Sequence, residues 1–414
     1  MAFEFVGDSD LSVPQKQFLS ELLQKYGFDK NKILIETVGK SGDNYISNVK
    51  RVIVERNSNK STKFIIKIAP TNDFTRDLTA ANAIFQNEQI IYEELLPIFH
   101  KMQIEARVPK EELIKFAKFH GAYLKAPHEI IILEDLQESG YVMLDRLKFI
   151  TNDTVKLILE DFATFHSMSY VLKHKQLKIF ENLKSRLFNF LAHTYKKDFW
   201  KKVLIILEND VINVFESNKY KNVIKGSLTD MYEKLMEVHA SENTKAFSII
   251  EQGDAWTNNI LFKIKDQKPM ECILIDYQLS KESVPVSDLL YMIFNCTDYA
   301  TRQKHYHEWI NYYYSQLDKS LNYFKLKAND VYPRYRLEID LKRYAKAFLG
   351  IIIIISSFIL RTPEEAKAAT AIKSDDIDDI VQNFRVTTLS AESIALFKAK
   401  IGGLIDSYYD FGYL

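Results

Sequence analysis

The sequence predicts an α+β fold of two lobes, with a small antiparallel sheet and a helix first and a larger, mainly helical part after it. Short alternating segments dominate the first third of the 414 residues, whereas helical patterns fill most of the rest. A hairpin pattern at 249–280 interrupts the helical part. Because this length exceeds what one core usually accommodates, we expect an N-terminal lobe of residues 1–137 and a C-terminal lobe of residues 138–414.

Composition excludes several classes of partner. Lysine plus arginine and aspartate plus glutamate each number 55, so the formal net charge is zero. No basic field is available to attract nucleic acid or anionic lipid, and we expect neither as a partner. Cys272 and Cys296 lie in apolar surroundings, which indicates reduced core thiols. The acidic N-terminus lacks a signal-peptide pattern, so a cytoplasmic protein is expected. The apolar run 347–360 is short for a membrane span and predicts a buried helix without membrane insertion.

The N-terminal elements begin with a helix at 12–26, for which Ser12 is the expected cap. Strand candidates at 32–38 and 45–55 follow, joined by a polar turn at 39–44. Backbone N–H groups in such a turn can meet anionic oxygens, although most turns of this composition simply reverse a hairpin.

Lys67 and Glu88 are charged residues in otherwise apolar patterns. Lys67 lies within a third strand at 63–69, where it needs either an anionic partner or a path to water at a sheet edge. In the helix predicted at 82–99, Glu88 shares the apolar face of Ile84, Ile91 and Leu95. A carboxylate on a buried face needs a cation, and Lys67 is the expected partner.

The segment 129–136 reads as an apolar strand that ends in acids, and helical patterns follow from residue 144 onward. His166 lies in one of these helices, at 154–169. Because no second metal ligand stands four residues after it, we interpret His166 as structural.

The hairpin at 249–280 contains a polar loop at 251–259, a strand on each side of a turn at 266–269, and acids at its end. If the strands pair, Asp254, Asn259 and Asp276 converge at one end. Two carboxylates and an amide around one point suit phosphoryl transfer, in which one Asp activates the hydroxyl while Asn and Asp hold Mg²⁺. The alternative is that Asp254 caps a turn and Asp276 merely ends a strand.

These motifs resemble known phosphotransferases. Gly253-Asp254, Asn259 and the run Ile275-Asp276-Tyr277-Gln278 are similar to the catalytic motif of the aminoglycoside and choline phosphotransferases, relatives of the protein kinases. The run Gly-Asp-Ala-Trp-Thr-Asn-Asn at 253–259, the Asp-Tyr-Gln at 276–278 and Ser-Asp-Leu-Leu-Tyr at 287–291 resemble more closely the insect ecdysteroid kinase-like family, also called CHK kinase-like. One departure is Gln252, where such enzymes commonly place His to brace the backbone.

The resemblance implies a protein-kinase-like fold that binds ATP and Mg²⁺. It implies that Asp254 is the catalytic base, that Asn259 and Asp276 are metal ligands, and that Lys67, paired with Glu88, binds phosphates. It further implies that the tip Ser41, Gly42, Asp43 and Asn44 covers the nucleotide phosphates and that the backbone of Glu134 and Leu136 meets the adenine edge. Asp288 would brace the catalytic loop, although capping of the next helix by Ser287 or Asp288 is the simpler expectation.

The resemblance also implies the reaction, a transfer of the ATP γ-phosphoryl group to a hydroxyl of an ecdysteroid or similar steroid alcohol. Trp256, Tyr277 and Gln278 are the candidate acceptor contacts, because they lie near the proposed centre. Two alternatives stay open. One is a choline- or ethanolamine-type or other small-alcohol kinase, and the other is a non-catalytic nucleotide- or ligand-binding protein of the same fold.

Overall fold

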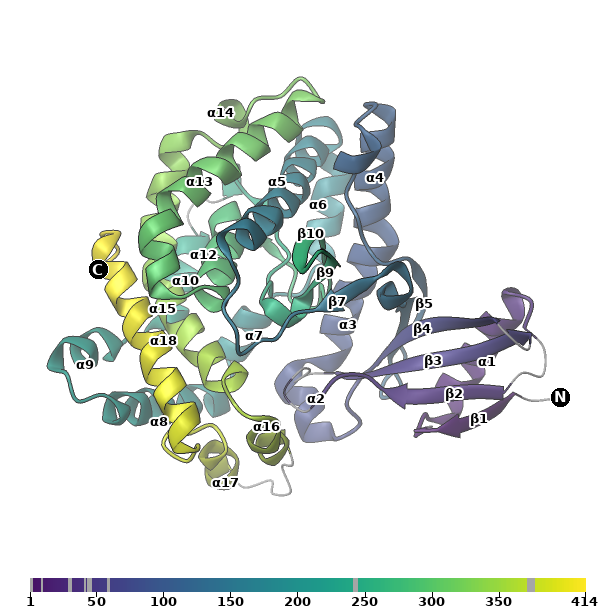
Figure 1. Ribbon diagram of the computed structural model, residues 1–414, viewed down its shortest axis with the longest axis horizontal. Coiled ribbons are helices and arrows are strands. Elements are labelled where there is room, and N and C mark those ends of the chain that lie inside the picture. Colours follow the sequence, from purple (N-terminus) through teal and green to yellow (C-terminus); the bar gives the residue numbers. More distant parts are fainter. Residues whose placement is uncertain are drawn as a thin grey trace.

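The computed structural model describes residues 3–8, 10–28, 32–40, 42, 47–57, 60–240, 245–370 and 377–414. Figure 1 shows a sheet-rich part, formed by the N-terminal third, beside a larger helical part that contains a small hairpin. The predicted two-lobed α+β class is therefore confirmed.

The N-terminal sheet has six strands in the order β1-β2-β3-β4-β6-β5. The strands are β1 (Glu4–Gly7), β2 (Lys32–Thr37), β3 (Asn48–Asn57), β4 (Lys60–Ile68), β5 (Phe119–Tyr123) and β6 (Ile130–Glu134), and only the β1–β2 pair is parallel. Helix α1 (Val13–Lys25) covers one face, where Leu19 packs with Val52 and Ile66. Because side chains alternate along a strand, Lys67 points to the opposite face.

That opposite face meets one long interrupted helix, preceded by the short α2 (Asp73–Thr79). It consists of α3 (Ala81–Ile90), a π-helical turn (Ile91–Leu95) and α4 (Leu96–Glu105). Pro97, two residues after the end of the π turn, lacks the N–H that a regular helical turn would use, which accounts for the widening. The predicted helical face is confirmed, because Ile84, Glu88, Ile91 and Leu95 are all fully buried.

The connection to the helical part runs through two 3₁₀ turns (Lys110–Glu112 and Leu136–Ser139) and β7 (Tyr141–Met143). β7 pairs with the hairpin β9 (Ile260–Lys265) and β10 (Lys268–Leu274). Asp266 and Gln267 alone form the hairpin turn, both with positive φ, so the turn is two residues shorter than expected. A 3₁₀ turn (Thr257–Asn259) precedes β9, and β8 (Ile249–Ile250) pairs with β11 (Glu282–Ser283).

The helical part surrounds α12 (Pro285–Cys296), every residue of which is buried. The helices before it are α5 (Asn152–Lys175), α6 (Leu177–Arg186), α7 (Phe190–Tyr195), α8 (Asp198–Val214), α9 (Asn218–Ile224) and α10 (Met231–Ala240). Those after it are α13 (Tyr299–Asn322), α14 (Ala328–Val331), α15 (Arg334–Ile359), α16 (Pro363–Thr370), α17 (Ile377–Gln382) and α18 (Ala391–Asp410). The buried helix predicted at 347–360 is confirmed as the second half of α15.

Two further findings bear on the expectations from composition. Cys272 and Cys296 are free and buried, as predicted. Within the described ranges, no single helix is long and apolar enough to cross a membrane. One pair of helices, α15 with residues 363–369 of α16, has that length and apolarity together, but the pair is bent by 108°.

Gly350 allows α15 to approach the backbone of a neighbouring segment, and its substitution tests this packing. A Cβ at Gly350 would lie 2.2 Å from the carbonyl oxygen of Ser227. Alanine is favoured over glycine in a helix by about 1 kcal/mol, but this overlap with backbone outweighs it. We expect Gly350→Ala to destabilise the protein by roughly 2 kcal/mol or more, seen as a lowered melting temperature.

Gly402→Ala on α18 is the matched control. Its added Cβ meets nothing closer than Tyr220 at 3.8 Å, so stability should be unchanged or rise by up to about 1 kcal/mol. Equal melting temperatures for the two variants would contradict this account of the packing.

Candidate active site

Lys67 joins the two parts of the molecule. Its Nζ lies 2.7 Å from Oε2 of Glu88 on α3 and 2.9 Å from Oδ1 of Asp276, which follows β10. Burial disfavours the charged ammonium, but the carboxylates of Asp276 and Glu88 outweigh it and raise the pKa of Lys67. The ion pair expected between Lys67 and Glu88 is therefore present, and a second carboxylate shares the same cation.

Asp254 and Asn259 form the adjoining half of the cluster. Nδ2 of Asn259 donates to Oδ2 of Asp254 at 2.9 Å and also to its carbonyl oxygen at 2.9 Å. The hydroxyl of Tyr291, on α12, donates to Oδ1 of Asp254 at 2.5 Å. Burial, reinforced by the negative charge of Asp276, raises the pKa of Asp254 to about 8.

The hairpin register brings these residues together. Leu274 pairs with Ile260, and the amide of Ile275 donates to the carbonyl oxygen of Asn259 at 3.0 Å, so Asn259 and Asp276 leave the hairpin at the same end. Asp276 has φ +60°, a left-handed conformation that Asp tolerates better than most residues. The convergence predicted from the hairpin pattern is thus a consequence of strand pairing.

Gln252 ties the loop that carries Asp254 to the one that carries Asp276. Its Nε2 donates to the carbonyl oxygens of Ile275 at 2.9 Å and Asp276 at 2.8 Å, while its Oε1 accepts from the amide of Asp254 at 2.6 Å. A side-chain amide offers both donors and an acceptor, so Gln252 braces the backbone, the task that the resemblance assigns to a His at this position.

Asp288 holds the same loop from the side of α12. Its Oδ2 accepts from the amide of Gln252 and its Oδ1 from the amide of Gly253, each at 2.9 Å. The expectation that Ser287 or Asp288 caps α12 is wrong, because the helix begins at Pro285 and Val284 occupies the cap position without a side-chain bond. Both residues lie inside the first turn, which leaves the Asp288 carboxylate free to bind the loop, as the resemblance implied.

Gly253 is required at its position in this loop. Its φ is +90°, and a Cβ there would lie 2.5 Å from the carbonyl oxygen of Leu279.

Three residues that support the site were not expected from the sequence. Nε2 of His166 contacts Oδ2 of Asp288 at 3.0 Å, and its Nδ1 contacts the hydroxyl of Tyr313 at 2.9 Å. His166 is therefore structural, as interpreted, but it supports the catalytic loop through Asp288. Tyr291 is the second, and its spacing of three residues from Asp288 on one helix was the available signal. Asn87 is the third, donating to the carbonyl oxygens of Gln278 and Ser280.

The donor set is compatible with Mg²⁺. Asn259 and Asp276 provide side-chain oxygens at one end of the hairpin, and Mg²⁺ uses few protein ligands together with waters and phosphate oxygens. In the described part of the chain, no group of three His, Cys, Asp or Glu residues is placed to hold a metal by itself. An ion at this site would therefore depend on the amide of Asn259 and on a bound phosphate.

The predicted nucleotide contacts are only partly within the described residues. Ser41, Asp43 and Asn44 lie outside them. Gly42 is described, and a Cβ there would lie 2.8 Å from Nη2 of Arg146 and 2.9 Å from Cβ of Ala366, so the first hairpin reaches the helical part.

The adenine contacts predicted at Glu134 and Leu136 remain predictions. The amide of Glu134 already donates to the carbonyl oxygen of Lys118 at 2.9 Å within the sheet region. The carbonyl oxygen of Asp135 also accepts from the amide of Glu138 at 3.0 Å.

The three candidate acceptor contacts are buried. Trp256, Tyr277 and Gln278 expose 7%, 1% and 2% of their surface. The ring of Tyr277 packs against Tyr92 and Phe165, with centroids 5.2 and 5.9 Å away. These residues have little surface to offer an acceptor, so their assignment stays a prediction.

The raised pKa of Asp254 predicts how stability depends on pH. An unfolded chain loses this proton near the ordinary pKa of 3.8, whereas the folded chain keeps it to about 8. Between those values the folded state binds the extra proton, so stability falls as pH rises from 5 to 8, by up to about 1.4 kcal/mol per pH unit from this group. Melting temperatures of the ligand-free protein across this range measure the slope.

Asp254→Asn should make that slope shallower, because the amide does not titrate. Asp266→Asn changes an exposed residue of the same hairpin and should keep the wild-type slope. A wild-type slope in both variants would show that Asp254 ionises normally.

Comparison with known proteins places this site in context. The model of the ecdysteroid kinase-like family matches residues 41–326. Among solved structures, the chain is similar to a Plasmodium vivax ethanolamine kinase at 14% identity and TM-score 0.40, covering 90% of this chain and 81% of that one. It is also similar to an aminoglycoside 2′-phosphotransferase in its GDP complex, at 12% identity and TM-score 0.44, covering 93% of this chain and 97% of that one.

No curated protein matches the chain in sequence. The family model, however, spans well over half of the chain and includes Lys67, Glu88, Asp254, Asn259 and Asp276. The resemblance seen in the motifs is therefore confirmed, and the chain belongs to the ecdysteroid kinase-like family.

Proposed function

We propose that the protein is an ATP-dependent phosphotransferase that moves the γ-phosphoryl group to a hydroxyl of a small molecule. The observation that carries this proposal is the meeting of Lys67, Glu88 and Asp276 beside the contact between Asp254 and Asn259. Membership of the ecdysteroid kinase-like family supports the same reaction class.

Each residue has a distinct task in this proposal. Asp254 orients the acceptor hydroxyl and takes its proton, and a pKa near 8 makes its carboxylate a stronger base than an ordinary Asp. Tyr291 and Asn259 hold that carboxylate by one hydrogen bond to each oxygen. Lys67 binds the nucleotide phosphates, and its contact with Asp276 is broken when it does so. Asn259 and Asp276 are the residues that would hold Mg²⁺, which when bound neutralises charge on the phosphates.

An apolar surface beside the hairpin favours an apolar acceptor. Val142, Met143, Leu147 and Phe149 each expose between 38% and 44% of their surface. Met143 pairs with Leu261, two residues after Asn259, so this segment runs beside the strand that follows the proposed reaction centre. It supports an ecdysteroid-like steroid alcohol over a choline-type cation, whose recognition relies on aromatic faces and negative charge.

Turnover tests the role of Asp254. With ATP, Mg²⁺ and a panel of hydroxylated steroids plus choline and ethanolamine, we expect ADP release by the wild type on at least one acceptor. Asp254→Asn should lower this rate by roughly 10²-fold or more, because the base is lost. Asp266→Asn, at the exposed end of the same hairpin, should react at the wild-type rate.

Two results would contradict the assignment. Unchanged turnover in Asp254→Asn would remove this residue from the mechanism. Nucleotide binding without ADP release on any acceptor would instead favour the non-catalytic binding protein.

Magnesium dependence tests Asp276 separately. We expect Mg²⁺ to tighten ATP binding to the wild type, because the ion links the phosphates to Asn259 and Asp276. In Asp276→Asn this enhancement should fall by roughly tenfold, while the Mg²⁺-free affinity stays the same or rises as Lys67 loses a competing carboxylate. Calorimetric titration with and without EDTA measures both affinities, and an unchanged enhancement would exclude Asp276 as a metal ligand.

A further inference from the structure

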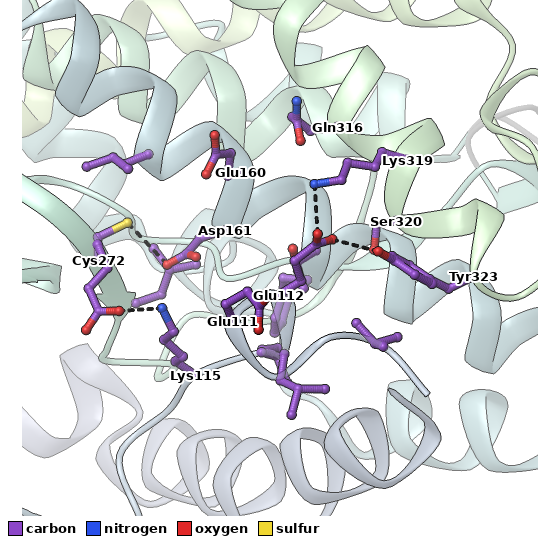
Figure 2. Close-up of a pocket in the computed structure, with 18 of the residues that line it drawn as sticks. Glu111, Glu112, Lys115, Glu160, Asp161, Cys272, Gln316, Lys319, Ser320 and Tyr323 are labelled. Carbon is purple, nitrogen blue, oxygen red and sulfur yellow. Dashed lines mark hydrogen bonds and ion pairs between the residues drawn. The ribbon is translucent and has the colours of Figure 1, made fainter. Parts of the chain in front are cut away.

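A cavity of about 520 Å³ lies apart from the residues of the proposed reaction centre. Figure 2 shows it between the segment after α4, α5, β10 and α13. None of the five proposed reaction-centre residues Lys67, Glu88, Asp254, Asn259 and Asp276 lines it, although Tyr277, a candidate acceptor contact, does. Its volume is in the usual range for small-molecule sites.

Acidic side chains dominate the polar lining of this cavity. The acids are Glu111, Glu112, Glu160, Asp161 and Glu271, and the bases are Lys115 and Lys319. Both lysines already have carboxylate partners, since Lys319 lies 3.1 Å from Glu112 and Lys115 lies 2.6 Å from Glu271. Lys115 also acts through space on Asp161, and Lys319 on Glu160, so these two bases are shared among five acids.

Glu160 and Asp161, adjacent on α5, have only neutral donors among the described residues. Glu160 accepts from the hydroxyl of Tyr312, and Asp161 accepts from the thiol of Cys272 at 3.2 Å. Figure 2 shows the Cys272–Asp161 contact on one side of the cavity and the Lys319–Glu112 pair on the other. Five acids and two bases leave an excess of negative charge in a half-enclosed site, so the cavity is electrostatically complementary to a positive charge.

The geometry favours an organic cation over a metal ion. No three acids in the described chain are placed to surround a metal, and the cavity is far larger than an ion requires. Its other walls combine the polar Thr164, Gln316 and Ser320 with apolar and aromatic residues that include Leu113, Leu157, Phe165 and Tyr323. Such a lining accommodates a carbon body next to a charged group.

We propose that this cavity is a second ligand site, which binds a small organic amine in its protonated form. The ammonium group lies between Glu160 and Asp161, and its N–H groups donate to both carboxylates. The carbon body packs against the apolar wall formed by Leu157 and Phe165. This site is separate from the proposed acceptor surface at Val142, Met143, Leu147 and Phe149, and its existence does not depend on turnover.

Calorimetric titration of the full chain with tyramine, tryptamine and spermidine tests the proposal, with MgATP present so that the nucleotide site is filled. We expect at least one amine to bind with one-to-one stoichiometry, while uncharged 4-ethylphenol does not bind. Asp161→Asn should weaken amine binding by about tenfold or more, because it removes the charge and keeps the shape. Asp153→Asn, an exposed acid on the same helix outside the cavity, should bind as the wild type does.

Proton release provides a second readout that a merely structural role of Asp161 would not give. Burial raises the pKa of Asp161 to about 7, so the group is partly protonated at neutral pH, and a bound cation favours its carboxylate. Amine binding at pH 7 should therefore release protons, seen as a heat that differs between phosphate and Tris buffers. This difference should disappear in Asp161→Asn, because the amide has no proton to release.

The proposal is overturned by any of three results. These are no binding of the three amines up to about 10 mM, amine binding that Asp161→Asn and Glu160→Gln leave unchanged, or binding of Ca²⁺ or Mg²⁺ alone at Asp161 in place of the amines.

Discussion

The buried ammonium of Lys67 is the constraint on which the proposed site depends. Its Nζ contacts the carboxylates of Glu88 on α3 and of Asp276 at the end of the hairpin. The sheet, the helix and the larger part of the molecule must therefore be placed correctly together. Removing one partner of such a group leaves an uncompensated buried charge, which costs more than the pair itself contributes. The same cation therefore couples the arrangement of the two lobes to the position of the residue proposed to hold the metal.

A polar network behind the loop that carries Asp254 holds this residue in place. It runs from His166 through Asp288 to the loop amides, and through Gln252 to the backbone at Asp276. Each contact is a hydrogen bond of ordinary length in a buried environment, where such bonds are strong and an unsatisfied group is costly. The network thus prearranges the loop before any substrate arrives, which is the condition for electrostatic catalysis.

The proposed active site and the cavity at α5 differ in the groups that contact their acids. In the proposed active site, a protein cation lies between Glu88 and Asp276. In the cavity at α5, Glu160 and Asp161 receive only neutral hydroxyl and thiol donors. We therefore expect Lys67 in the proposed active site to exchange its contact with Asp276 for a nucleotide phosphate. We expect the cavity at α5 to bind a cation from solution.

The sequence alone determined the features that follow from local periodicity. Strand alternation separated Lys67 from the apolar face of β4, helical spacing placed Glu88 on a buried face, and hairpin pairing brought Asn259 to the same end as Asp276. The family followed from contiguous motifs in the same region. Only the tertiary structure decided that Asp288 holds the loop and does not cap its helix. The same is true of the contact between His166 and Asp288, which are 122 residues apart in the chain. These contacts depend on how α5 and α12 pack, and no local pattern encodes the relative placement of two helices that distant in the chain.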